Sequence, residues 1–322
     1  MDLTLNRKTV LKALVVILLF LSDITYGQQS PFNTDSYWVF VPYIYNPAIV
    51  GSKDFLSVGV NASFKGSSYA QLLSGNGRIS KTHDGYFSSP DISKFTNFGI
   101  GGSIFNDADG LSSKYGASAA ASYQILMNTN ELSFLSFGLA VKETHNKIST
   151  DSLGIANSEI NKFHTNIDLG IYYYGTSVFA GISGVNLLGS PWKSEPEGIY
   201  DVPVSREYFF TAGFKVLLNK SMNIVLEPSV LISAADSTFD KISENIDPIV
   251  KLYLDRFCLG ASYRGSGKIS IFAEFKYPHF YLGGYYGFKN KTPYFKEKPV
   301  AELTFGVNLL SDRYRRTRST HW

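Results

Sequence analysis

The strongest constraint on this fold is an alternation of apolar and polar residues that recurs along most of the chain. In residues 163–174 the two kinds of side chain alternate, which places them on opposite faces of a β-strand. Gly175-Thr176-Ser177 then turns the chain, and the alternation resumes from Val178, as expected of an antiparallel hairpin. Similar segments follow one another between residues 56 and 309. The pattern predicts about fourteen strands.

A transmembrane helix over residues 169–192 is the competing interpretation of the central hairpin. This stretch has no charged residue and is long enough to cross a bilayer as a helix. It also contains five glycines and Pro191, which weaken a helix strongly. The hairpin is therefore favoured.

The length of the predicted strands indicates a membrane protein. Most have eight to fourteen residues, longer than usual in a globular domain and suited to a tilted crossing of a bilayer. Charged residues make up only 18% of the chain, which has 24 Phe, 21 Tyr and 28 Gly. Because no open sheet edge is permitted in hydrocarbon, the strands must close. We expect an all-β fold, a closed transmembrane antiparallel up-and-down β-barrel with outer-membrane lipid around it.

The connections between strands alternate in length, as in outer-membrane barrels, which have short periplasmic turns and longer outer loops. If both termini of the barrel are periplasmic, residues 81–97 form a long connection on the side of the short turns. They are either a periplasmic excursion or a sign that the first strands are miscounted. The predicted short turns are 128–130, 175–177, 219–221, 255–256 and 278–279, and the longer connections are 146–162, 188–205, 235–248 and 289–299.

Four segments follow from this interpretation. Residues 1–27 have a basic start, an apolar run and small residues before a cleavage site, which predicts a secretory signal peptide and export to the outer membrane. Residues 28–54 are expected to form an N-terminal periplasmic segment, and residues 55–310 the barrel. Residues 311–322 form a basic tail that is either a disordered end or a contact with lipid headgroups or an acidic partner.

Nothing in the sequence predicts catalysis. The five histidines never stand at metal-ligand spacing, and no nucleophile motif occurs, so we expect no cofactor, no metal site and no enzymatic activity. A net charge of only +3 gives no reason to expect a nucleic-acid partner. The inward faces should form a hydrated lumen rather than an ion or substrate path. Its candidate polar residues are His164, Asn166, Asp168, Glu227, Glu274 and Lys276.

Several short motifs occur in one order along nearly the whole predicted mature chain. They comprise Asn46-Pro47-Ala48 with Gly51, Asp107 with Gly110, residues 135–140, residues 181–187 with Gly181 and Asn186, and residues 260–264 with Gly260, Tyr263 and Arg264. The ordered set resembles the PorP/SprF family of the Bacteroidetes type IX secretion system. The chain departs from the family pattern at residues 61–66, where an Arg-Gln-Trp-like stretch often occurs, and in its basic tail.

The resemblance implies an outer-membrane barrel that assists secretion or surface attachment of a cognate type IX cargo protein, such as a large adhesin. In some relatives it implies a link to gliding motility. It also implies a possible periplasmic partner that binds peptidoglycan. The alternative from the barrel alone is an outer-membrane transport channel for a small solute.

Overall fold

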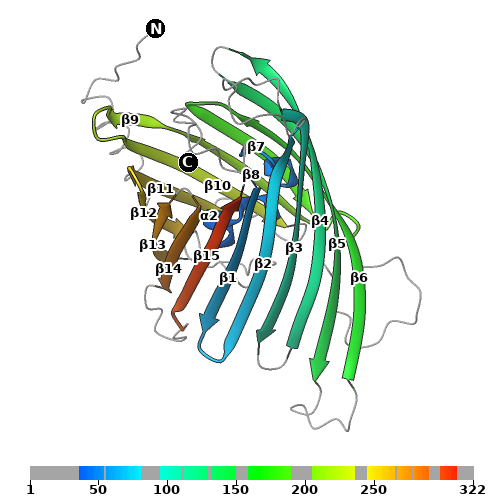
Figure 1. The fold of residues 1–322 in the computed structure, drawn as a ribbon. Helices are drawn as coiled ribbons and strands as arrows, with labels where there is room; N and C mark the ends of the chain where they lie inside the picture. The colour runs from blue at the N-terminus through cyan, green and yellow to red at the C-terminus, as the bar shows by residue number, and fades with distance from the viewer. Residues whose placement is uncertain are drawn as a thin grey trace.

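A computed structural model shows one closed antiparallel sheet (Figure 1). It describes residues 36–53, 56–80, 95–109, 112–129, 132–149, 159–189, 205–235, 245–264, 267–277, 279–289 and 298–309. The strands are β1 (Leu56–Lys65), β2 (Ser68–Ser80), β3 (Phe95–Asp109), β4 (Ser112–Asn128), β5 (Ser133–Ser149), β6 (Glu159–Tyr174), β7 (Val178–Val185), β8 (Glu207–Phe214), β9 (Val216–Asn219), β10 (Ile224–Ala235), β11 (Ile246–Leu254), β12 (Phe257–Arg264), β13 (Lys268–Tyr277), β14 (Phe280–Lys289) and β15 (Val300–Leu309).

The sheet closes where its first and last strands pair. β1 runs antiparallel to β15 from Leu56 opposite Leu309 to Phe64 opposite Ala301. β8 and β9 both pair with β10 and are separated only by Lys215, so they count as one position around the wall. The barrel therefore has fourteen strand positions, and the predicted fold class and strand number are confirmed.

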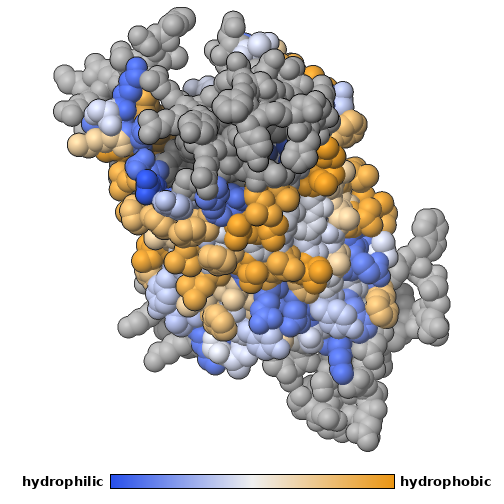
Figure 2. Space-filling model, viewed as in Figure 1, coloured by the Kyte–Doolittle hydropathy of each residue, from blue (hydrophilic) through white to orange (hydrophobic). Residues whose placement is uncertain are grey.

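The two faces of the wall are inverted relative to a water-soluble protein. On β1, outward-facing Val60 is 49% exposed, whereas inward-facing Asn61 is only 1% exposed. On β15, Phe305 and Thr304 repeat this contrast at 51% and 2%. Figure 2 shows the hydrophobic side chains spread over the middle of the wall and hydrophilic ones gathered toward the lower end of the view. The period-two pattern thus assigned the lipid-facing side correctly.

The helical alternative for residues 169–192 is wrong. The chain forms β6 and β7 there, joined by a turn in which the Gly175 N–H donates to the Val178 carbonyl at 3.0 Å. None of the helices in the described ranges has both the length and the apolar character needed to cross a membrane.

The connections follow the predicted alternation in part, because the face that carries the long connections also carries three short ones, between β1 and β2, β3 and β4, and β12 and β13. Residues 81–94 join β2 to β3 on the same face as the short turns, so the first strands were not miscounted. This segment itself lies outside the described residues, as do residues 1–35 and the basic tail beyond residue 309. We assign the face with the short turns to the periplasm, because outer-membrane barrels have short periplasmic turns.

Three short helices precede the barrel strands. They are α2 (Tyr37–Phe40), η1 (Pro42–Ile44) and η2 (Pro47–Ile49). The sequence predicted a periplasmic segment over residues 28–54, but its described part lies within the barrel (Figure 1). The physical reason is its composition, because the aromatic side chains of this segment are removed from water by packing against the wall.

Candidate functional site

The lumen is filled by residues 36–53, hereafter called the plug. Tyr37 and Tyr45 are 2% and 1% exposed, and Trp38 stacks edge-on against Tyr45 with ring centroids 5.8 Å apart. Inward-facing apolar side chains surround the plug from strands on all sides of the barrel. This cluster consists of Leu72, Phe105, Ala120, Ala140, Val185, Phe209, Leu231, Ile249, Phe272 and Tyr285 on the wall, with Tyr37, Trp38, Val41, Tyr43, Ile44, Tyr45 and Val50 on the plug.

The Asn46-Pro47-Ala48 motif begins the last turn of the plug. Asn46 is extended and caps η2, since its Oδ1 accepts a hydrogen bond from the Ala48 N–H at 3.0 Å. Pro47 takes the first helical position, where its missing N–H costs nothing. The Asn46 amide also donates from Nδ2 to the carbonyl of Ile171 on β6 at 3.2 Å. One side chain therefore both shapes the motif and fixes it to the wall.

Glycines on the wall make room for this motif. A Cβ atom at Gly138 would lie 2.1 Å from the Ala48 nitrogen, and one at Gly170 would lie 2.0 Å from Asn46 Oδ1. At Gly181 it would lie 2.9 Å from Asn46 Nδ2. Any larger residue at Gly138 or Gly170 would collide with the plug. The structure thus brings together sequence motifs that lie up to 135 residues apart.

The periplasmic end of the plug is held by its backbone. The Val50 carbonyl accepts hydrogen bonds from Ser122 Oγ at 2.6 Å and from Gln124 Nε2 at 3.0 Å, both on β4. Gly51 follows with φ +68°, and a Cβ there would lie 2.6 Å from the Gly99 Cα. The glycine is therefore required both by the backbone conformation and by the close approach to β3.

Polar contacts hold the remainder of the plug. Ser36 Oγ donates to a Glu302 carboxylate oxygen and accepts from Asn61 Nδ2 at 3.1 Å. The Tyr45 carbonyl accepts from Ser183 Oγ at 2.6 Å. The Tyr43 hydroxyl donates to the Gly102 carbonyl at 2.8 Å, and burial raises the pKa of this hydroxyl well above its ordinary value, so it stays a protonated donor.

These contacts correct one expectation about the lumen. The sequence predicted a hydrated interior, but at the level of the plug the interior is apolar and closely packed. Three polar side chains of the wall, those of Ser122, Gln124 and Ser183, bond to the plug backbone. The prediction failed because the alternation shows which residues face inward, but not what they meet there.

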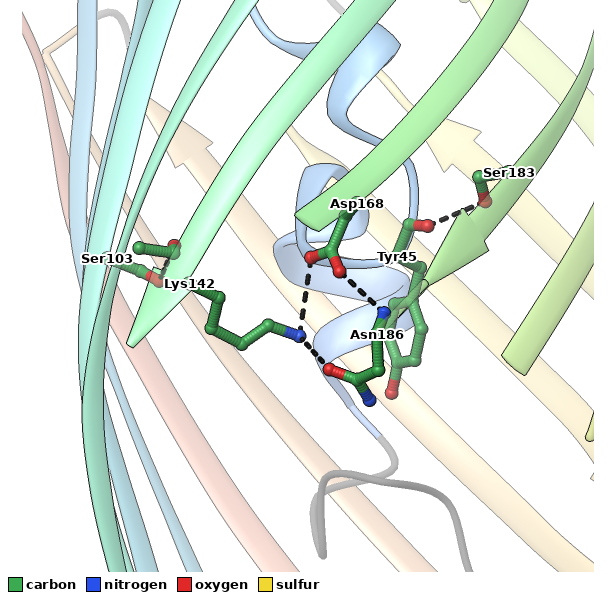
Figure 3. Close-up of polar contacts among 7 residues, drawn as sticks. Tyr45, Ser103, Lys142, Asp168, Ser183 and Asn186 are labelled. Carbon is green, nitrogen blue, oxygen red and sulfur yellow. Dashed lines mark hydrogen bonds and ion pairs between the residues drawn. The ribbon is translucent and has the colours of Figure 1, made fainter. Parts of the chain in front are cut away.

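Near the outer end of the plug, Lys142 of β5, Asp168 of β6 and Asn186 after β7 converge (Figure 3). Lys142 Nζ lies 3.3 Å from Asp168 Oδ2 and donates to Asn186 Oδ1 at 3.1 Å. The Asn186 N–H donates to Asp168 Oδ1 at 2.7 Å. Asn186 has φ +56°, a conformation that Asn tolerates better than most residues. All three are buried, and this network joins a predicted lumen residue, Asp168, to a predicted family position, Asn186.

Sequence reasoning missed Lys142 as part of this site. A signal was present, because Lys142 is the first charged residue of the strand that begins at Ser133 and it falls on the polar face. Its partner could not be read from the pattern, since the β5–β6 register places Asn166, not Asp168, directly opposite it.

The other predicted lumen residues fall into two groups, one of which brings Glu227, Glu274 and Lys276 close enough together for their charges to interact. Glu227 of β10 is buried and bonds to Lys251 at 3.3 Å and to the Tyr253 hydroxyl at 3.2 Å. Glu274 and Lys276 of β13 form an ion pair at 3.2 Å. His164 and Asn166 are buried on β6, on the outer side of Asp168. The six residues therefore do not form one site.

The remaining family positions are also dispersed. Arg264 Nε donates to Asp247 Oδ2 at 3.1 Å, whereas the neighbouring Tyr263 lies on the opposite face of β12. A Cβ at Gly260 would lie 2.2 Å from the Phe272 ring. Asp107 lies on β3, and Gly110 falls outside the described residues. Across the described ranges, no group of three or more His, Cys, Asp or Glu side chains could hold a metal ion.

Comparison with known proteins finds one family. A family model described as type IX secretion system membrane protein PorP/SprF matches residues 26–306. No curated protein matches the chain.

Solved structures of barrel proteins are similar in part. The KdgM porin is 9% identical, with a TM-score of 0.36 over 79% of this chain and 98% of the porin. CymD, titled a monoaromatic hydrocarbon channel, is 10% identical, with a TM-score of 0.40 over 86% of this chain and 92% of CymD. CdiB from Acinetobacter baumannii is 9% identical, with a TM-score of 0.38 over 79% of this chain, which spans only 59% of CdiB.

Proposed function

The chain belongs to the PorP/SprF family of type IX secretion system membrane proteins, and on this premise we propose that it is a non-enzymatic outer-membrane accessory protein. Its role is to assist the secretion or surface attachment of a cognate type IX cargo, such as a large adhesin. The outer end of the barrel meets the cargo, and the periplasmic side meets the secretion machinery.

The observation that carries this proposal is the packed plug. Its Tyr37, Trp38, Tyr43 and Tyr45 side chains are nearly inaccessible to solvent. The backbone or side-chain groups of Asn46, Val50 and Tyr45 are bonded to three different wall strands, β4, β6 and β7. Because the plug occupies the lumen, a partner protein would meet the surfaces of this barrel rather than its centre. That supports a docking role over a transport role.

Gene deletion tests the proposal. We expect the cognate cargo to stay unsecreted or to be shed into the medium, while unrelated type IX substrates are still exported. Re-expression of the wild-type chain should restore surface display. Normal display of every type IX cargo in the deletion strain would contradict the proposal.

The same strains distinguish a partner on the periplasmic side of the barrel from a partner on its outer side. A periplasmic partner that binds peptidoglycan should co-purify with the barrel from crosslinked outer membranes, whether or not the cargo is present. If the cargo supports gliding, the deletion strain should lose spreading on agar. Normal spreading would remove gliding from the proposed role without affecting cargo attachment.

A small-solute channel remains the functional alternative, and liposome swelling distinguishes it. We expect purified barrel in liposomes to give no more sugar uptake than empty liposomes, because the plug fills the lumen. Rapid uptake by the wild-type barrel would favour the channel.

A further inference from the structure

The barrel wall is much taller on one side than on the other. β3 to β6 have 15 to 17 residues each, whereas β7 and β8 have eight each. A transmembrane strand needs only about 9–11 residues. The surplus of β6 is at its beginning, because only Leu169–Tyr174, its last six residues, pair with β7. At this end β4 reaches as far as β5, with Ser112 opposite Ile148, so the step in wall height lies between β6 and β7.

The surplus lies outside the hydrocarbon. On the outward face of β5 and β6, Val141 and Leu169 are 47% and 48% exposed and belong to the apolar surface. Further along, Glu143 accepts a hydrogen bond from Thr165 Oγ1 on the exposed face, and the next outward positions hold the rings of His145 and Phe163. A carboxylate is strongly disfavoured on the lipid face of a barrel. The start of β6 therefore projects beyond the membrane on the face opposite to the short turns.

This projection has an edge that the described residues do not pair. Residues 159–168 of β6 pair with β5 on one side, but on the other side β7 ends at Val185. The Leu187 N–H reaches the Ile167 carbonyl at 3.0 Å, which shows that this carbonyl points away from β5. Because backbone groups alternate along an antiparallel strand, the N–H and C=O groups of Asn161, Phe163 and Thr165 point the same way. We call these groups the β6 edge.

The connection that follows β7 contains several prolines. Residues 190–204, which connect β7 to β8, include Pro191, Pro196 and Pro203. Proline has no N–H, so these three positions of the connection cannot donate to the edge. A long strand edge outside the membrane is a template for pairing with another chain.

The surroundings of the β6 edge indicate the kind of strand that it would accept. On the outward face, the rings of Tyr115, His145 and Phe163 form a row across β4, β5 and β6, with centroids 4.6 and 4.2 Å apart. Phe163 ends this row and is 66% exposed. On the inward face, buried His164 and Asn166 flank the edge. An added strand would place an apolar side chain beside Phe163 and polar side chains toward the lumen.

We propose that the β6 edge is a docking site for an extended strand of a type IX secreted protein, which pairs with β6 outside the membrane and extends the barrel wall. This inference rests on the proposed function, since it names how the cargo would be held. The backbone row supplies affinity, and alternate apolar and polar residues of the incoming strand supply specificity. A strand of about six to eight residues fits the length of the edge.

Substitution by proline tests the backbone contact directly. Thr165→Pro removes an N–H of the β6 edge but no hydrogen bond to β5, so the barrel should keep its folded mobility on unheated gels. We expect the amount of cargo retained on the cell surface to fall about tenfold. The reason is that the variant loses one or two hydrogen bonds and disturbs the pairing of the neighbouring residues. The matched variant Thr165→Ala keeps the backbone donor and should retain cargo like the wild type. If Thr165→Pro folds and retains its cargo fully, the inference is wrong.

Photocrosslinking in living cells identifies the occupant. With p-benzoylphenylalanine at position 163, we expect a crosslink to a secreted type IX protein, mapped to one of its extended segments. With the same probe at Leu169, on the lipid face, no such product should form. A crosslink from position 163 to residues 190–204 or to a second copy of the barrel would overturn the inference.

The gene deletion keeps the two proposals apart. If deletion leaves cargo display unchanged, the proposed function fails and the edge has no cargo to hold. If deletion sheds the cargo but Thr165→Pro does not, the function stands and the docking site is refuted.

Discussion

The plug and the β6 edge differ in how their backbone groups are bonded. In the plug, the Tyr45 and Val50 carbonyls each accept hydrogen bonds from wall side chains, and the Ala48 N–H is capped by Asn46. Along the β6 edge, the described residues supply no partner, and the nearest bond on this side of β6 is the one from the Leu187 N–H to the Ile167 carbonyl. The named plug groups are bonded within the chain, whereas the described residues give the edge groups of Asn161, Phe163 and Thr165 no partner.

The two regions therefore have different roles in the same barrel. Buried polar groups without partners are costly, so the lumen must satisfy its own groups for the barrel to be stable. Outside the hydrocarbon, backbone groups that bond to water cost little until a partner strand replaces the solvent. We therefore expect substitutions around the plug to change stability and those at the edge to change binding.

The largest effect on stability is expected at Lys142, where the plugged barrel meets the projecting wall. Lys142→Met would leave Asp168 buried without its counter-charge, which typically costs about 3–5 kcal/mol of unfolding free energy. Urea unfolding in lipid vesicles measures the change. The double variant Lys142→Met/Asp168→Leu should recover part of the loss. Lys220→Met, which removes an exposed lysine from a turn, is the control, and equal stability of the two single variants would contradict the prediction.

Gly138→Ala is expected to disturb the plug by steric overlap. Its Cβ would lie 2.1 Å from the Ala48 nitrogen, so the plug must shift, at a cost of about 1–3 kcal/mol. We also expect the variant to admit sugars in liposome swelling. Gly284→Ala is the matched control, because its Cβ would meet only Leu303 at 4.0 Å. A Gly138→Ala barrel that is as stable and as impermeable as this control would show that the plug does not depend on the glycine.

Asn46→Ala removes the cap of η2 and the hydrogen bond to Ile171 together. We expect a loss of about 1–2 kcal/mol in plug docking, seen as faster hydrogen exchange of the Ala48 amide. Asn46→Asp refines the test, because it keeps the capping oxygen and loses only the Nδ2 donor. Its exchange rate should fall between those of the wild type and Asn46→Ala. Identical rates in Asn46→Asp and Asn46→Ala would assign the whole effect to the wall contact.

The smallest effect is expected for Tyr43→Phe. It deletes a hydrogen bond of 2.8 Å to the Gly102 carbonyl but keeps the buried ring, so we expect a loss of about 1 kcal/mol. Urea unfolding against wild type measures it, with Tyr69→Phe on the exposed face as the control. A loss above that for Asn46→Ala would mean that the hydroxyl, rather than the motif, anchors the plug.

The sequence determined the barrel because the decisive signals are local. The alternation of residues such as Val60 and Asn61 assigns each side chain to a face, and strand length together with the lipid-facing apolar surface requires closure. The order of the strands then follows from short turns. The Asn46-Pro47-Ala48 turn was likewise readable from three adjacent residues, and so was its resemblance to a family.

Only the tertiary structure decided where the N-terminal segment lies and how high the wall stands. The fit of Asn46 against Gly170 and Gly181 joins positions more than 120 residues apart, and the glycines themselves do not show which chain will approach them. Likewise, the length of β6 can be estimated from its pattern, but its unpaired edge depends on where β7 stops. Both features arise from contacts between distant segments, which a local periodicity does not encode.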